Sequence, residues 1–212
     1  MTDELIARLS ADLKPVPRSA MFRLVLGAVL VGAMISAIVM LGSIGPRGDI
    51  EAASGTMIFW TKFIYTLAFA LLGAVAVLIL TRPDGRTRWP WFVALGILVL
   101  LIIGAFVQLL RAAPADMMPL VFGASPMRCL TYAVAFSLPI LAASLLAMRR
   151  LAPASPTLAG FAAGLMSGGT GAWIYAFACN EPGMMFLAIW YTLAIALVGL
   201  IGAVMGRLLL RW

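Results

Sequence analysis

Long apolar stretches separated by short polar turns dominate the hydropathy pattern of the chain. A helix needs about 20 predominantly apolar residues to cross the hydrocarbon core of a bilayer, and six stretches of the chain reach that length. Turn-forming pairs such as Gly45-Pro46 and Pro182-Gly183 lie between them. The pattern therefore predicts an all-α membrane protein with a bundle of six transmembrane helices, at residues 24–44, 57–81, 89–110, 128–148, 157–179 and 184–206.

The N-terminal residues 1–23 are the only long segment outside these stretches. The connections between the stretches are too short for a further domain, so we expect residues 24–212 to form one transmembrane domain. The first apolar stretch is longer than the apolar region of a signal peptide, which spans about 7–15 residues. We therefore expect the chain to retain it as a span.

The distribution of Arg and Lys indicates the orientation of the chain, because cytoplasmic loops are enriched in both residues. If the N-terminus is inside, 11 of the 15 basic residues lie on the cytoplasmic side and 4 on the other, whereas the 8 acidic residues divide equally. Each cytoplasmic loop then carries at least two Arg. The pattern predicts that both termini lie in the cytoplasm.

Composition agrees with a membrane protein and excludes several kinds of site. Apolar residues make up 64% of the chain and charged residues 11%, against about 25% charged residues in a typical soluble protein. The chain has no His and two Cys, which excludes His-ligated haem, His-based zinc sites and four-Cys zinc sites. We expect no cofactor, no metal ion and no catalytic residues. We interpret the net charge of +7 as membrane topology rather than nucleic-acid binding.

Small residues recur at four-residue spacing along the predicted helix 157–179, at Gly160, Gly164, Gly168 and Ala172. Hydrophobicity cannot drive helix association within lipid, so such a face is typical of a close helix–helix contact. The pattern predicts a packing face. It leaves open whether the partner is another helix of this chain or a second copy, so a homo-oligomer remains an alternative.

Polar side chains are scarce in the predicted spans, and Lys62 is the most conspicuous of them. It lies near the start of the 57–81 helix, close to the predicted outer interface. We favour an interpretation in which its long side chain extends outward past Trp60 to water. Two alternatives remain, a buried functional lysine or an ion pair with an acidic residue of the outer loops. With Asp116 and Glu181, Lys62 forms a candidate polar cluster on the side that receives a signal.

The two cysteines both fall at predicted outer helix ends. Cys129 lies at the start of helix 128–148 and Cys179 at the end of helix 157–179. Antiparallel neighbours would bring these ends to the same depth, on the oxidising side of the membrane where a disulfide can persist. We favour a redox-sensing pair over the alternative that each Cys is a small apolar filler. A weaker alternative is a soft-metal site that includes Glu181.

Apolar residues at helical spacing in the N-terminal segment predict an amphipathic helix with an apolar stripe of Leu5, Ile6, Leu9 and Leu13. A lipid-binding helix usually has a strongly basic polar face, whereas this face mixes acidic and basic residues. Anionic lipid would therefore attract it weakly. We favour a protein partner that binds the apolar stripe in a groove.

Local patterns along nearly the whole chain resemble the NrsF family. These are six-span, multi-pass proteins of the bacterial inner (cytoplasmic) membrane that act as anti-sigma factors for an extracytoplasmic-function (ECF) sigma factor. The resemblance is carried by Asp12-Leu13-Lys14-Pro15-Val16, Trp60-x-Lys62-x-x-Tyr65, Arg128-Cys129-Leu130, Tyr175-Ala176-x-x-Cys179-x-Glu181, Trp190-Tyr191 and Leu209-Leu210-Arg211-Trp212.

The resemblance implies a signalling role rather than an enzymatic one. It implies that the chain holds an ECF sigma factor at the membrane until an envelope or redox-type stress is sensed, with Cys129 and Cys179 in sensing. The implied partners are the sigma factor and the lipid bilayer, with no direct nucleic-acid contact. Family members often have His before the second cysteine, whereas this chain has Ala178, which argues against metal-dependent sensing.

Two other functions agree less well with the residues. A small transporter or channel usually has ionisable groups near the bilayer midplane, and the six predicted spans have none there. A membrane thiol–disulfide oxidoreductase usually has a closely spaced Cys-x-x-Cys pair, whereas these cysteines are 50 residues apart. Both functions are kept as alternatives.

Overall fold

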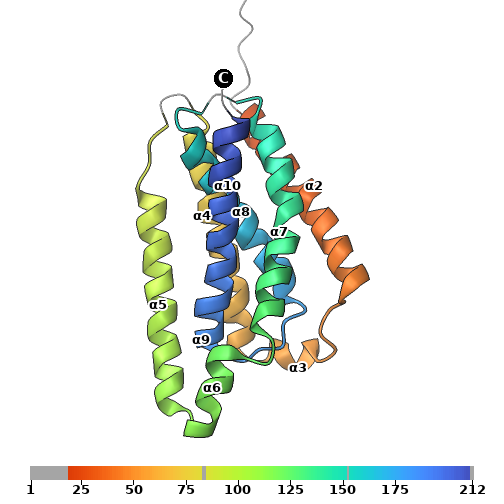
Figure 1. Ribbon diagram of the computed structural model, residues 1–212, viewed down its shortest axis with the longest axis vertical. Coiled ribbons are helices and arrows are strands. Elements are labelled where there is room, and N and C mark those ends of the chain that lie inside the picture. Colours follow the sequence, from red (N-terminus) through yellow and green to blue (C-terminus); the bar gives the residue numbers. More distant parts are fainter. Residues whose placement is uncertain (1–18, 83–84, 152, 211–212) are drawn as a thin grey trace, which may run out of the picture.

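The computed structural model describes residues 19–82, 85–151 and 153–210. Every regular element in these ranges is helical, so the prediction of an all-α fold is confirmed (Figure 1). The long helices are α2 (Ala20–Ser43), α4 (Met57–Leu80), α5 (Trp89–Arg111), α7 (Pro126–Met148) and α8 (Pro156–Ala176). The last helical segment consists of α9 (Met184–Phe186), a π-helix η1 (Leu187–Tyr191) and α10 (Thr192–Leu209).

Five helical segments of the described ranges are long and apolar enough to cross a membrane, namely Ala20–Ser43, Met57–Leu80, Trp89–Arg111, Pro114–Met148 and Met184–Leu209. The sixth predicted span forms α8, which is not among these five. Glycine and hydroxyl side chains make α8 less apolar than its neighbours, and most of its 21 residues are buried by other helices. The finding agrees with a membrane protein whose central helix is shielded by protein.

Helix α8 is central because its small residues let three helices approach it closely. A Cβ atom on Gly160 would overlap the Gly202 carbonyl of α10, and one on Gly169 would overlap the backbone of α4. A Cβ on Gly171 would likewise overlap Ser137 of α7. The predicted small-residue face is thus used within this chain, against α10. Helix α2 packs mainly on α7, and α5 stands at the side of the bundle against α4 and α9 (Figure 1).

Two short helices occupy connections that we expected to be turns, α3 (Ile50–Ser54) and α6 (Pro114–Phe122). Helix α6 begins with Pro114, whose fixed φ suits the first helical turn, and ends before Gly123, which has a φ of 61° that favours glycine. Figure 1 shows α3, α6 and α9 at one end of the bundle, which we call the α6 end. The Arg-rich α4–α5 and α7–α8 connections lie at the opposite end.

The predicted helix 157–179 is too long at its C-terminus, because α8 ends at Ala176. The backbone N–H groups of Phe177 and Ala178 bond to carbonyls three residues earlier, which tightens the chain into a turn. The Phe177 carbonyl accepts a hydrogen bond from the Arg47 backbone at 3.0 Å. Cys179 therefore lies in the α8–α9 connection, beyond the helix on which we expected it.

Candidate functional site

The structure brings the two cysteines together at the α6 end. Cys129 lies in the first turn of α7, and its backbone N–H donates to the Ser125 carbonyl at 3.2 Å. The exposed fraction is 1% for Cys129 and 2% for Cys179, and both belong to the same apolar cluster. Neither is in a disulfide. The prediction that both lie at one end of the helices is confirmed, while their sensing role stays a prediction.

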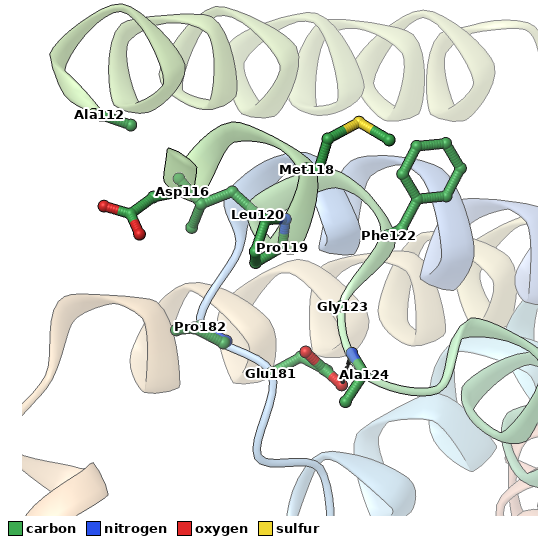
Figure 2. A pocket seen from close by; sticks show the side chains of 10 residues that line it. All are labelled: Ala112, Asp116, Met118, Pro119, Leu120, Phe122, Gly123, Ala124, Glu181 and Pro182. Carbon is green, nitrogen blue, oxygen red and sulfur yellow. Dashed lines mark hydrogen bonds between the residues drawn. The ribbon is translucent and has the colours of Figure 1, made fainter. Parts of the chain in front are cut away.

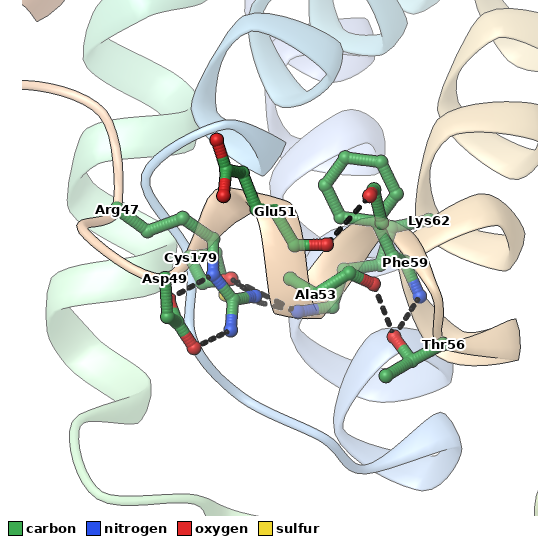
Figure 3. A network of polar contacts seen from close by, with 9 residues as sticks. Arg47, Asp49, Glu51, Ala53, Thr56, Phe59, Lys62 and Cys179 are labelled. Atoms are coloured by element: carbon green, nitrogen blue, oxygen red, sulfur yellow. Dashed lines mark hydrogen bonds and ion pairs between the residues drawn. The ribbon is translucent and has the colours of Figure 1, made fainter.

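Cys179 is held by two cationic side chains, as Figure 3 shows. The Lys62 Nζ donates to the Cys179 carbonyl at 3.3 Å and to its Sγ at 3.5 Å. The Arg47 Nη1 donates to the same carbonyl at 3.1 Å. The loop after α2 and the start of α4 are therefore both hydrogen-bonded to one residue of the α8–α9 connection.

Our preferred interpretation of Lys62 was wrong. The residue is 2% exposed, and its ammonium group turns inward to Cys179 instead of extending past Trp60. The physical reason is that the α8–α9 connection lies against the start of α4, where the carbonyl and the sulfur of Cys179 accept hydrogen bonds from the ammonium group. The alternative of a buried lysine describes the structure.

Arg47 is fixed by a bidentate ion pair with Asp49. Its Nε and Nη2 donate to the two carboxylate oxygens, each at 2.7 Å. This hydrogen bonding lowers the pKa of the Asp49 carboxyl and raises that of the Arg47 guanidinium. The planar fork leaves Nη1 free to reach the Cys179 carbonyl. The loop after α2 is thereby fastened to the α8–α9 connection.

The electrostatic environment makes Cys179 the more readily ionised thiol. It lies in a connection outside the helices, and a hydrogen bond from the Cys129 thiol lowers its pKa. The positive charge of Lys62 lowers it further, while burial acts in the opposite direction. A thiolate is the reactive form of cysteine, so this arrangement favours chemistry at the Cys179 sulfur.

A tyrosine that sequence reasoning did not single out completes the site. Tyr191 is fully buried, and its hydroxyl has no well-aligned hydrogen-bond partner among the described residues. The Tyr191 hydroxyl lies close enough to the Cys179 thiol to influence its ionisation. Tyr191 ends the π-helix η1, and such π-bulges are frequent at functional sites. The sequence carries no signal for a π-bulge, because its apolar pattern matches that of an ordinary helix.

A cavity of about 390 Å³ connects the thiol pair with the surface at the α6 end. It is lined by both cysteines, by Tyr132 and Tyr175, and by three charged residues, Arg47, Arg128 and Glu181. A cavity of this size holds small molecules as well as water. Both cysteines therefore border a cavity that small molecules can enter.

The predicted polar cluster of Lys62, Asp116 and Glu181 is divided between two places. Asp116 and Glu181 line a cavity of about 810 Å³ between α6 and the α8–α9 connection (Figure 2). Glu181 also accepts a hydrogen bond from the Ala124 backbone at 2.9 Å, which ties α6 to the connection. Lys62 lies instead with Cys179. Among the described residues, no three Cys, Asp or Glu side chains gather as metal ligands.

The predicted partner-binding residues Leu5, Ile6, Leu9 and Leu13 lie outside the described residues.

Comparison with known proteins agrees with the resemblance seen in the sequence. The NrsF family, described as negative regulator of sigma F, matches residues 9–212. The chain is 38% identical over 216 aligned residues to the anti-sigma-F factor NrsF of Caulobacter vibrioides (strain NA1000 / CB15N), with 100% of this chain and 99% of the relative covered. It is 34% identical over 212 residues to the probable anti-sigma-F factor NrsF of Azospira oryzae (strain ATCC BAA-33 / DSM 13638 / PS), with the same coverage. No solved structure matches the chain. A match over nearly the full length, shared by the family and two relatives, shows that the chain belongs to the NrsF family.

Proposed function

We propose that this protein is a membrane-bound anti-sigma factor and not an enzyme. In this proposal it holds an ECF sigma factor at the cytoplasmic face of the bacterial inner membrane and releases it on an envelope or redox-type stress. The single observation that carries the proposal is the family match over residues 9–212. The two relatives are named as anti-sigma-F factors and align over 100% of this chain.

The proposed sensor is the Cys129–Cys179 pair. Its support is structural, because both thiols are buried in one cluster and line the same cavity at the α6 end. The Arg-rich connections lie at the opposite end of the bundle, which agrees with a cytoplasmic location for that end. The sensor and the proposed sigma-binding side would then face opposite sides of a six-span membrane domain.

The direct test of the proposal is co-purification. The full chain, solubilised in detergent from its native cell, is expected to bring an ECF sigma factor with it, identified by mass spectrometry. Oxidant treatment before solubilisation is expected to reduce the amount recovered. Recovery of no sigma factor from untreated cells would contradict the proposal.

The proposed orientation predicts the behaviour of topology reporters. A reporter active only in the cytoplasm should work when fused after Arg86, Arg150 or Trp212, and should be silent in the 45–56, 112–127 and 180–183 segments, because positive residues are retained inside. Enzymatic activity of each fusion, normalised to its amount, is the measurement. A silent fusion after Trp212 with an active one in 45–56 would contradict the orientation.

The proposed docking helix predicts partner release by charge insertion. Leu9→Asp or Leu13→Asp places a carboxylate in a desolvated contact, and loss of such a contact costs about 2 kcal/mol or more, roughly a 30-fold loss of affinity. Target transcription, measured with a promoter reporter, should become high without stress, while the protein stays in the membrane. Ala11→Asp, on the opposite side of the predicted helix, is the matched control. Full repression by both Leu variants would refute docking through this stripe.

A further inference from the structure

The two thiols of the proposed sensor have different surroundings. Cys179 receives a hydrogen bond from Lys62 on its sulfur, and its carbonyl is held by Lys62 and Arg47. The hydroxyl of Tyr191 lies beside it without an aligned partner among the described residues. Cys129 sits in the first turn of α7 in the same apolar cluster, and among the hydrogen bonds of the described residues no cationic side chain donates to its sulfur. The Lys62 ammonium group and the Tyr191 hydroxyl therefore interact with the Cys179 sulfur more than with the Cys129 sulfur.

We propose that Cys179 is the thiol that attacks the oxidant, that Cys129 is the thiol that resolves the product, and that Lys62 is the positioning residue that activates Cys179. The assignment rests on the proposed function, in which the two cysteines are the sensor. It adds the order of the two steps and a residue that controls the first of them.

Lys62 is suited to this role by its geometry. An ammonium group 3.5 Å from a sulfur stabilises the thiolate over the thiol. The second hydrogen bond, to the carbonyl of the same residue, fixes the ammonium group in front of that sulfur. A buried lysine in a membrane-spanning helix is costly and marks a functional site by default. Among the described residues, both hydrogen bonds of the Lys62 ammonium group go to Cys179.

The oxidant that fits is a small hydroperoxide, because the thiols are almost fully buried and reached through a cavity of about 390 Å³. The Cys179 thiolate attacks the terminal oxygen, the O–O bond breaks, and the alcohol, or water from hydrogen peroxide, leaves with a proton. Cys179 is then a sulfenic acid, to which the Tyr191 hydroxyl can donate a hydrogen bond. The Cys129 sulfur attacks the Cys179 sulfur, the S–O bond breaks, and water leaves with the Cys129 proton. The two thiols thus supply the two electrons that reduce the peroxide.

The test compares the reactivity of the two thiols in the full chain purified in detergent. Iodoacetamide labelling of each cysteine is followed in time by peptide mass spectrometry. We expect Cys179 to react at least about tenfold faster than Cys129, since one unit of pKa changes the thiolate fraction about tenfold well below the pKa. Lys62→Met should lower the Cys179 rate about tenfold, and Lys62→Arg should restore most of it.

Arg111→Met is the matched control. It removes a positive charge from an exposed residue in the last turn of α5, at the same end of the bundle but outside the cavity that the two cysteines line. We expect it to leave the Cys179 rate nearly unchanged. Equal labelling of both cysteines in the parent, or an unchanged Cys179 rate in Lys62→Met, would overturn the assignment. An equal loss of rate in Lys62→Met and Lys62→Arg would show that Lys62 acts only through packing.

A second measurement decides the order of the steps without any change at Lys62. After hydrogen peroxide treatment, dimedone, which traps sulfenic acids, should label Cys179 in Cys129→Ser but leave Cys129 unlabelled in Cys179→Ser. Labelling in the reverse pattern would overturn the assignment, even if Lys62→Met fails to accumulate.

The labelling measurements report the reactivity of the thiols and do not depend on binding of the sigma factor. If they hold while the sigma factor is not released, the proposed function fails alone. If oxidant releases the sigma factor but Cys129 is labelled first, the assignment fails alone.

Discussion

Replacing Cys129 or Cys179 by serine is expected to abolish the response of target transcription to oxidant, and the double replacement is expected to match either single one. Neither variant can form the bond between the two sulfurs, so the protein should stay in the arrangement with free thiols that the structure describes. Equal, non-additive effects are characteristic of two residues that act as one unit. The measurement is induction of a promoter reporter by hydrogen peroxide in cells that carry each variant.

The energy available from the bond sets the size of the effect. Moving a two-state equilibrium from 99:1 to 1:99 takes about 5.5 kcal/mol, and a disulfide typically contributes about 2–4 kcal/mol. The bond alone therefore biases the switch without completing it. Oxidation also removes the thiolate that faces Lys62, and a buried charge that loses its partner is strongly destabilised. The two effects together are of the size that a full switch needs.

Ala133→Ser is the matched control for this prediction. It adds a hydroxyl to a residue one turn from Cys129 that is also 1% exposed, and a helical Ser can bond to the carbonyl four residues earlier. Normal induction in this variant would show that the hydroxyl itself is tolerated. Normal induction in either single Cys variant would reduce both cysteines to packing residues.

Gly160→Leu is expected to prevent accumulation of the folded protein. Any Cβ at this position would overlap the Gly202 carbonyl and the backbone of Gly206 on α10. Overpacking in a close-packed interior costs about 1–3 kcal/mol or more, and backbone cannot move aside as a flexible side chain can. Because α8 packs on three helices, separation from α10 would disturb the whole bundle. The amount of protein in the membrane and its Tm in detergent are the measurements.

Gly27→Leu provides the comparison for Gly160→Leu. It lies on α2, and apart from the neighbouring backbone of α2 itself, no atom of the described residues comes within 4 Å of a Cβ built at this position. Leucine is also the better helix former by about 1 kcal/mol, so this variant should accumulate normally and melt no lower than the parent. Similar losses in the two variants would mean that the α8–α10 contact is not the reason for the defect.

The long helices could be predicted from the sequence because their signal is local. Uninterrupted apolar stretches define α2, α4 and α5 to within a few residues of their observed bounds. The four-residue spacing of Gly160, Gly164 and Gly168 likewise marks a face of α8 before its partner is known. Lipid requires every span to be helical. An apolar stretch can therefore be assigned as a helix, and small residues four positions apart can be assigned to one face of it.

The details of the site depended on contacts that no local pattern records. Lys62 turns inward to Cys179 of the α8–α9 connection, a residue that lies 117 positions away in the sequence. The chain beyond α8, including Cys179, is held by hydrogen bonds from Arg47, 132 residues away from Cys179 in the sequence. The π-bulge that ends at Tyr191 involves the same apolar residues as a regular helix would. Sequence reasoning therefore found the thiols but not the groups that distinguish them.

The direct backbone contact between α8 and α10 has a mechanical consequence. Side chains between two helices act as a soft layer that can absorb a displacement by changing rotamers, but Gly160, Gly202 and Gly206 leave no such layer. Over the stretch from Gly160 to Gly168, which is about 12 Å long at 1.5 Å per residue, the two backbones touch directly. A displacement of α8 along this stretch would therefore carry α10 with it, without any repacking of side chains between them.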